Sequence, residues 1–129
     1  MISEEELNRI SGLVIGCAIE VHRVMGPGLL ESAYQTCLAW ELRNTGVAFA
    51  EQVAVPVRYK SLVVPNAYRL DLLVENEVVV EMKSVERIEP IHSAQLLTYL
   101  KTNNFRLGLL LNFNVEVMRK GIKRVVNKL

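Results

Sequence analysis

Two carboxylates and a lysine lie at close spacing in the middle of this 129-residue chain. Asp71 falls in a run of alternating apolar and polar residues, and Glu81 and Lys83 fall in a second run after the polar break Glu75–Glu77. Two such runs around a short break predict a β-hairpin. Carboxylate oxygens are the ligands that Mg²⁺ prefers, and a lysine can stabilise charge on a reacting phosphoryl group. These residue types therefore suit metal-dependent cleavage of phosphodiester bonds.

The register of the hairpin decides whether these side chains meet, because a one-residue slip moves every side chain to the other face. A two-residue loop would mix the faces, so we expect a loop of three residues, with Val74 opposite Val78 and Asp71 opposite Glu81. Asn76 or Glu77 then takes the left-handed conformation of the turn. This register predicts one apolar face made of Leu70, Leu72, Val74, Val78, Val80 and Met82. The opposite face holds Arg69, Asp71, Leu73, Val79, Glu81 and Lys83.

Directly opposed carboxylates repel each other, so the pair needs compensation. One interpretation is a surface ion cluster in which Lys83 and Arg69 neutralise the two acids, as on many solvent faces of antiparallel sheets. The other is a metal site, in which Asp71 and Glu81 bind Mg²⁺, with Mn²⁺ as a substitute, and the Met82 backbone carbonyl is a third ligand. Lys83 would then position the attacking water or stabilise the pentacovalent charge.

A predicted helix over about residues 29–44 carries Glu31 and Tyr34, which are three apart and share a face. Gly28 precedes them at the start of the helix. A structural role accounts for all three, because glycine caps, glutamate favours the positive end of a helix and tyrosine packs. We also keep Glu31 as a candidate catalytic acid and Tyr34 as a candidate substrate-positioning residue.

A second polar stripe lies on a helix predicted over about residues 90–102, which Pro90 opens. His92, Gln95 and Tyr99 repeat at helical spacing, in place of the lysines and glutamates of an ordinary solvent face. All three are candidate substrate-positioning residues. A structural histidine is the alternative for His92, since no second histidine or cysteine accompanies it.

Composition indicates one globular domain over residues 1–129, with 50% hydrophobic and 22% charged residues. No apolar run is long enough to span a bilayer, and the acidic start does not resemble a secretory signal, so we expect a cytoplasmic protein. The net charge of +1 argues against a general coat for nucleic acid. A basic cluster near the C-terminus either contacts phosphates or forms a solvated face. Its members are Arg119, Lys120, Lys123, Arg124 and Lys128.

The periodicities predict the order α-α-β-β-β-α-β-β, which is an α/β fold with a mixed central sheet flanked by helices. The first helix runs to about Val24 and follows a capping box at Ser3. The first strand is expected at residues 53–59, at a sheet edge because of Pro56. Later strands are expected at residues 107–113 and 122–126.

The motif residues together resemble a known family. Asp71 followed by Glu81-Met82-Lys83 looks like the signature of the PD-(D/E)xK nuclease superfamily, and Gly28…Glu31…Tyr34 matches the motif of its GxxExxY family. The resemblance covers nearly the whole chain and implies a restriction-endonuclease-like core. It assigns Asp71 and Glu81 to Mg²⁺ and Lys83 to catalysis, with Glu31 reaching toward the metal. Gln95 and Tyr99 match a QxxxY helix that adjoins the active centre in related nucleases. Leu70 stands where the superfamily often has proline.

The leading hypothesis is therefore a Mg²⁺-dependent nuclease that hydrolyses phosphodiester bonds, with DNA as the expected partner. Two alternatives stay open. One is a non-catalytic module that keeps the fold and binds nucleic acid or protein. The other is an accessory subunit that needs a helicase or a second copy, as in a homodimer with two sites and a wider groove.

Overall fold

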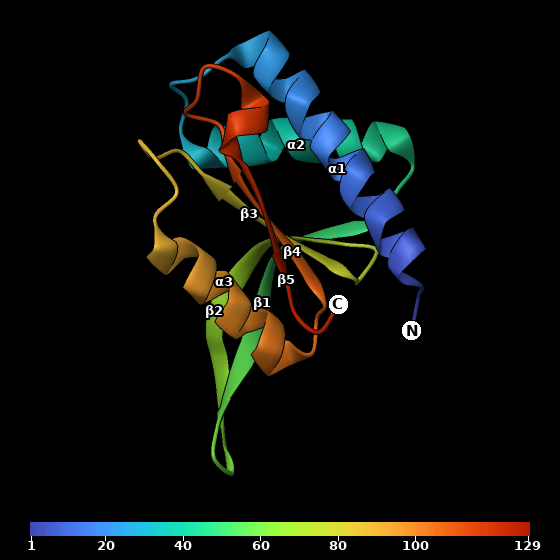
Figure 1. The fold of residues 1–129 in the computed structure, drawn as a ribbon, viewed down its shortest axis with the longest axis vertical. Coiled ribbons are helices and arrows are strands. Elements are labelled where there is room, and N and C mark those ends of the chain that lie inside the picture. The colour runs from blue at the N-terminus through green and yellow to red at the C-terminus, as the bar shows by residue number, and fades with distance from the viewer.

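A computed structural model describes residues 1–129 as a three-layered α/β domain, with helices on both faces of a central sheet (Figure 1). The expected element order is confirmed, and one 3-10 turn is added. The elements are α1 (Glu4–Met25), α2 (Glu31–Thr45), β1 (Phe49–Tyr59), β2 (Leu62–Val74), β3 (Val78–Lys83), α3 (Pro90–Asn103), β4 (Leu107–Asn112), η1 (Met118–Gly121) and β5 (Ile122–Val126). None of the helices combines the length and the apolar character needed to cross a membrane.

The five strands form one mixed sheet in the order β1-β2-β3-β4-β5. The central pair, β3 and β4, is parallel, and the other three pairs are antiparallel. A parallel pair needs a long crossover, which α3 provides. β1 lies at an edge, where Pro56 costs no hydrogen bond to a further strand.

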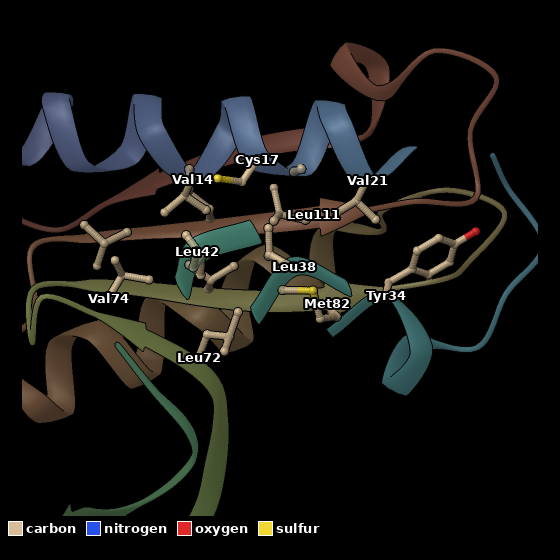
Figure 2. Packing of buried hydrophobic residues seen from close by; sticks show 14 of the residues in the cluster. Val14, Cys17, Val21, Tyr34, Leu38, Leu42, Leu72, Val74, Met82 and Leu111 are labelled. Carbon is tan, nitrogen blue, oxygen red and sulfur yellow. The ribbon is translucent and has the colours of Figure 1, made fainter. Parts of the chain in front are cut away.

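Two apolar clusters hold the layers together. The larger one packs α1 and α2 on one face of the sheet, and the smaller one packs α3 on the other. Figure 2 shows side chains of α1 (Val14, Cys17 and Val21) and α2 (Leu38 and Leu42) packed against side chains of the strands (Leu72, Val74, Met82 and Leu111). All six residues of β4 are buried, because both faces of this central strand are covered.

Short-range signals fix the helix ends. Ser3 caps α1 by accepting a hydrogen bond from the Glu6 amide at 3.0 Å. Gly26 ends this helix with a φ of +67°, a conformation that glycine adopts at no steric cost. Pro90 occupies the first turn of α3, where its missing N–H leaves no internal hydrogen bond unmade.

The expected hairpin register is confirmed for the three residue pairs next to the turn, whereas the ladder does not extend to the expected pairs of Asp71 with Glu81 and Leu70 with Met82. Val74 pairs with Val78, and Leu72 pairs with Val80, so the loop has three residues. Asn76 is left-handed, as expected, with a φ of +56°. The second left-handed residue is Glu75 at +53°, whereas Glu77 is not left-handed.

The expected placement of Leu70 on the same apolar face as Leu72 is wrong, and helices cover both faces of the hairpin. Leu73 and Val79 pack under α3, so the face that carries the acids is buried as well. Leu70 also joins the cluster under α3, although Leu72 joins the cluster under α1 and α2. β2 therefore departs from regular alternation at Asp71, between these two leucines. The cause is a crossover helix that covers this face, which the hairpin alone does not reveal.

The ribbon formed by β1 and β2 is longer than the sequence pattern indicates. β1 begins at Phe49, β2 begins at Leu62, and the two strands pair out to Tyr59 and Leu62. Pro65 interrupts the apolar alternation in this stretch and hides the strand from periodicity. The far half of the ribbon projects below the rest of the fold in Figure 1.

Gly121 gives a direct test of packing at the start of β5. A Cβ at this position would lie 2.0 Å from the backbone oxygen of Asn112, which cannot move without disturbing β4. Gly121→Ala is expected to lower the free energy of unfolding by about 3 kcal/mol. The matched control is Gly12→Ala in α1, where a Cβ meets nothing within 4 Å. It is expected to stabilise the protein by about 0.5–1 kcal/mol. Equal urea midpoints for the two variants would contradict this packing.

Candidate metal centre

The site begins where β2 separates from β3. Leu72 and Val80 form the last pair of the ladder between these strands. At the next position Asp71 Oδ2 accepts a hydrogen bond from the Met82 amide at 2.8 Å. A side chain thus takes the place of the backbone acceptor that a continuing ladder would supply. This hydrogen bond holds the Asp71 carboxylate against β3, at the point where the sheet opens.

Glu81 lies beside Asp71 and is largely withdrawn from water. Its Oε1 is fully buried and has no hydrogen-bond partner. Burial raises the pKa of this carboxyl to about 9, and the neighbouring Asp71 charge adds to the rise, while Lys83 opposes it more weakly. Without a further partner, Glu81 is therefore protonated at neutral pH.

The surface ion cluster considered from the sequence does not form. The four salt bridges of the protein all join other residues, so none neutralises Asp71 or Glu81. Arg69, which only this interpretation assigned to the neutralisation, donates to the backbone oxygen of Gln52 at 3.5 Å. The two acids stay without a cationic partner at hydrogen-bonding distance.

The donor set fits a hard divalent cation. A buried carboxylate oxygen without a partner is costly, and a cation between two carboxylates removes that cost. Mg²⁺ commonly uses only one or two protein carboxylates and keeps several waters. No three His, Cys, Asp or Glu side chains lie close enough together to form a larger ligand set. The protein ligands on offer are therefore Asp71 and Glu81, together with backbone oxygen.

A small cavity of about 20 Å³ adjoins Glu81, which is room for one water or ion. It lies between the end of β3 and the inner face of α3. Its lining consists of Glu81, Lys83, His92, Gln95, Leu96, Tyr99 and Leu110. The polar stripe expected on α3 is thus brought to the same place as the glutamate and the lysine of the hairpin.

Within this stripe the three side chains have different surroundings. His92 Nδ1 accepts a hydrogen bond from the Glu89 amide at 3.0 Å, so the ring caps α3 while it borders the cavity. Tyr99 stacks on Tyr68 of β2, and burial followed by the charge of Glu81 raises the pKa of Tyr99. Gln95 is exposed at the rim.

Glu31 reaches the same end of β3 but joins a different contact. Its Oε2 accepts a hydrogen bond from the Ser84 amide at 3.1 Å. The Ser84 hydroxyl in turn donates to the Leu29 backbone oxygen at 2.9 Å. The start of α2 is therefore tied to the residue that follows Lys83. The carboxylate is not close enough to Asp71 and Glu81 to make a three-acid metal group, contrary to its expected reach toward the metal.

Tyr34 is fully buried, and its contacts are internal. The ring stacks on Phe113 with centroids 4.4 Å apart. The hydroxyl donates to the Gly26 backbone oxygen and accepts from the Leu29 amide at 3.1 Å. Tyr34 therefore orders the loop between α1 and α2, and leaves no exposed surface with which to contact a substrate.

Three residues near the site were not found from the sequence: Gln35, Gln52 and Tyr68. The Gln52 amide donates to Gln35 Oε1 at 2.9 Å and lies 3.4 Å from Asp71 Oδ1. The spacing offered a weak signal for Gln35, which lies one helical turn after Glu31. The Tyr68 hydroxyl is buried without a partner, and burial and the charge of Glu81 raise the pKa of Tyr68. Only the pairing of strands brings Gln52 and Tyr68 to the acids.

The basic cluster near the C-terminus lies apart from the small cavity. Lys120 and Lys123 line a separate open groove of about 550 Å³ at the start of α3, together with Arg87. Arg124 donates to Asn8 Oδ1 at 2.6 Å. The carboxylates and the basic cluster therefore belong to neighbouring but distinct surfaces.

Comparison with known proteins gives one family and one fold. The family model described as "PD-(D/E)XK nuclease superfamily" matches residues 8–125. No curated protein matches this chain. Among solved structures, the one titled "Crystal structure of SSO0001" is similar, with 15% identity and a TM-score of 0.52. The match covers 93% of this chain and 79% of that chain. At this identity the likeness concerns the fold alone.

Proposed function

Because the chain belongs to the PD-(D/E)XK nuclease superfamily, we propose that it is a Mg²⁺-dependent nuclease that hydrolyses phosphodiester bonds of DNA. Nucleases of this superfamily typically use divalent metal ions. Within the superfamily we place the chain in the GxxExxY family, on the strength of Gly28, Glu31 and Tyr34.

One observation carries the proposal: the buried and unpartnered Oε1 of Glu81 beside the Asp71 carboxylate. A fold has no structural need for two adjacent acids, one of them desolvated, in the absence of a compensating charge. A divalent cation supplies that charge, and it also supplies Lewis acidity and a more acidic bound water.

In this proposal each residue of the site has a separate role. Asp71, Glu81 and the Met82 backbone carbonyl hold the cation, and the Met82 amide keeps Asp71 in place. Lys83 borders the cavity beside Glu81, where its ammonium group can stabilise negative charge that develops on the phosphoryl oxygens. Gln95, Tyr99 and His92 border the same cavity and position the substrate. Glu31 fixes the end of β3 through Ser84 and thereby the position of Lys83.

The test is incubation of the purified protein with linear, circular, single-stranded and branched DNA, with Mg²⁺, Mn²⁺ or EDTA. Cleavage that depends on the metal is the expected result. Titration calorimetry with Mn²⁺ in the absence of DNA gives a second readout, with heat that is absent in Asp71→Asn. Absence of cleavage on every substrate, together with absence of this heat, would indicate the non-catalytic module instead.

Gln52 is expected to act through Asp71 as a positioning residue. Its backbone is left-handed at a φ of +52°, so Gln52→Gly removes the amide without adding strain. We expect kcat to fall by about tenfold with KM unchanged, which is the cost of one hydrogen bond to a charged group. The matched control is Asn76→Gly, which replaces a left-handed residue in the hairpin turn. Equal kcat values for the two variants would show that Gln52 does not position Asp71 for the reaction.

A further inference from the structure

The outer part of the β1–β2 ribbon, residues 56–65, is an arm that the core of the protein does not explain. All residues of the arm are exposed except the half-buried Val57. Lys60 and Ser61 form its tip, between the last paired residues Tyr59 and Leu62. At its base the Pro56 backbone oxygen accepts a hydrogen bond from Asn103 of α3 at 3.3 Å, and the rest of the arm extends away from the helices and the other strands (Figure 1). A ribbon that buries so little apolar surface contributes little to folding, so its length calls for a partner.

The charge of this region is one-sided. Residues 53–69 contain three cations, Arg58, Lys60 and Arg69, and no aspartate or glutamate. The whole chain has 15 basic and 14 acidic residues. A stretch without acids is therefore a local departure from balance, and none of its cations takes part in a salt bridge. Such a surface matches a polyanion.

The tip combines this charge with exposed apolar and aromatic surface. Tyr59 is 60% exposed and Leu62 is 59% exposed. The Lys60 ammonium lies 5.3 Å from the centre of the Tyr59 ring. Apolar side chains can contact the thymine methyl group in the major groove of DNA, and neighbouring cations can contact the phosphates beside it.

The arm and the candidate metal centre are built from the same strand. Asp71 lies at the base of β2, and Leu62 begins this strand at the tip. At about 3.3 Å per residue, these two positions are about 30 Å apart along the strand. One turn of B-form DNA is about 34 Å long, and its major groove admits a two-stranded β-ribbon. The ribbon is therefore long enough to reach about one helical turn along a duplex that has a phosphate at Asp71.

We propose that this arm binds the major groove and flanking phosphates of double-stranded, B-form DNA, and that duplex DNA is the substrate class of the neighbouring site. The assignment of duplex DNA as the substrate rests on the proposed nuclease function, whereas the binding of DNA by the arm does not. Single strands have no groove for the ribbon. The deep, narrow major groove of A-form RNA excludes it.

The experiment measures binding by fluorescence anisotropy in EDTA, with a 20-base-pair DNA duplex, one of its strands alone and an RNA duplex of the same sequence. The variant is Arg58→Ala/Lys60→Ala. The control is Arg9→Ala/Arg23→Ala, which removes the same charge from exposed positions on α1. We expect the arm variant to bind the DNA duplex about tenfold more weakly. The slope of the logarithm of its affinity against the logarithm of the salt concentration should be less steep, by the amount expected for about two lost phosphate contacts. Binding of the single strand is expected to be unchanged.

Equal duplex affinities for the arm variant and the control would overturn the inference, as would an equal loss on the single strand. A wild-type protein that binds no duplex would do the same. Sedimentation tests the other occupant, a second copy of the chain: a dimer that Leu62→Ser dissociates would assign the arm to self-association and overturn the proposal. Duplex binding through the arm without any cleavage would support the role of the arm and contradict the proposed nuclease function. Cleavage by a protein whose arm variant binds the duplex normally would support the nuclease function and contradict the role of the arm.

Discussion

Replacing Asp71 with asparagine, or Glu81 with glutamine, is expected to lower metal-dependent cleavage by about a thousandfold or more. Each substitution removes one of two carboxylates that face a single site, and no third acid lies close enough to compensate. A cation contributes several kcal/mol to stabilising charge on the phosphoryl group, and about 4 kcal/mol corresponds to a thousandfold in rate. Asparagine still offers an oxygen to the Met82 amide, so the local fold is preserved.

The measurement is single-turnover cleavage at saturating protein, with circular dichroism to verify folding. Glu116→Gln is the matched control, since this exposed acid has no hydrogen-bond or salt-bridge partner. Its rate is expected to equal that of the wild type. Cleavage by Asp71→Asn or Glu81→Gln at more than a tenth of the wild-type rate would mean that the reaction occurs elsewhere on the molecule.

The second large effect concerns stability in the absence of metal. The pKa of Glu81 is raised from 4.5 to about 9, chiefly by burial and then by the charge of Asp71. Between these two values the folded protein holds a proton that the unfolded chain has released. The contribution of Glu81 to stability is therefore complete below about pH 4.5 and is lost as the pH rises toward about 9. Over this window the free energy of unfolding is expected to fall by up to about 1.4 kcal/mol per pH unit.

Urea unfolding in EDTA at pH 6, 7, 8 and 9 checks this expectation. The comparison is between wild type and Glu81→Gln, because glutamine cannot ionise and other titrating groups cancel in the difference. The stability of the variant relative to the wild type should increase steadily with pH. A difference that is independent of pH would show that Glu81 is already ionised in the metal-free protein.

The local pattern was sufficient to predict the hairpin and the chemistry it carries. Alternation and a polar break fixed the register from Val74 to Val78, and this register placed Asp71 near Glu81. Both features depend on neighbours within a few residues, so periodicity can reveal them. The same holds for the capping of α1 at Ser3 and for the start of α3 at Pro90.

The surroundings of the acids could not be predicted in this way. The hairpin pattern left both a surface ion cluster and a metal site open for Glu81, and the structure places this residue beside α3, which follows it in the chain by several residues. Desolvation depends on which elements pack together, and nothing in the spacing of a hairpin specifies that. The same limit applies to Gln52, which comes from a strand that the sequence places far from Glu81.

The amino-acid sequence by itself determined the order of the elements, the register of the hairpin, and the acids and lysine available for chemistry. Each of these follows from short-range periodicity or residue type. Only the tertiary structure decided that Tyr34 is a buried loop-ordering residue, that Glu31 contacts Ser84, and that Oε1 of Glu81 lacks a partner. These properties arise from contacts between segments that are distant in the chain. Because these contacts bury Glu81 beside Asp71, the two carboxylates require a compensating positive charge.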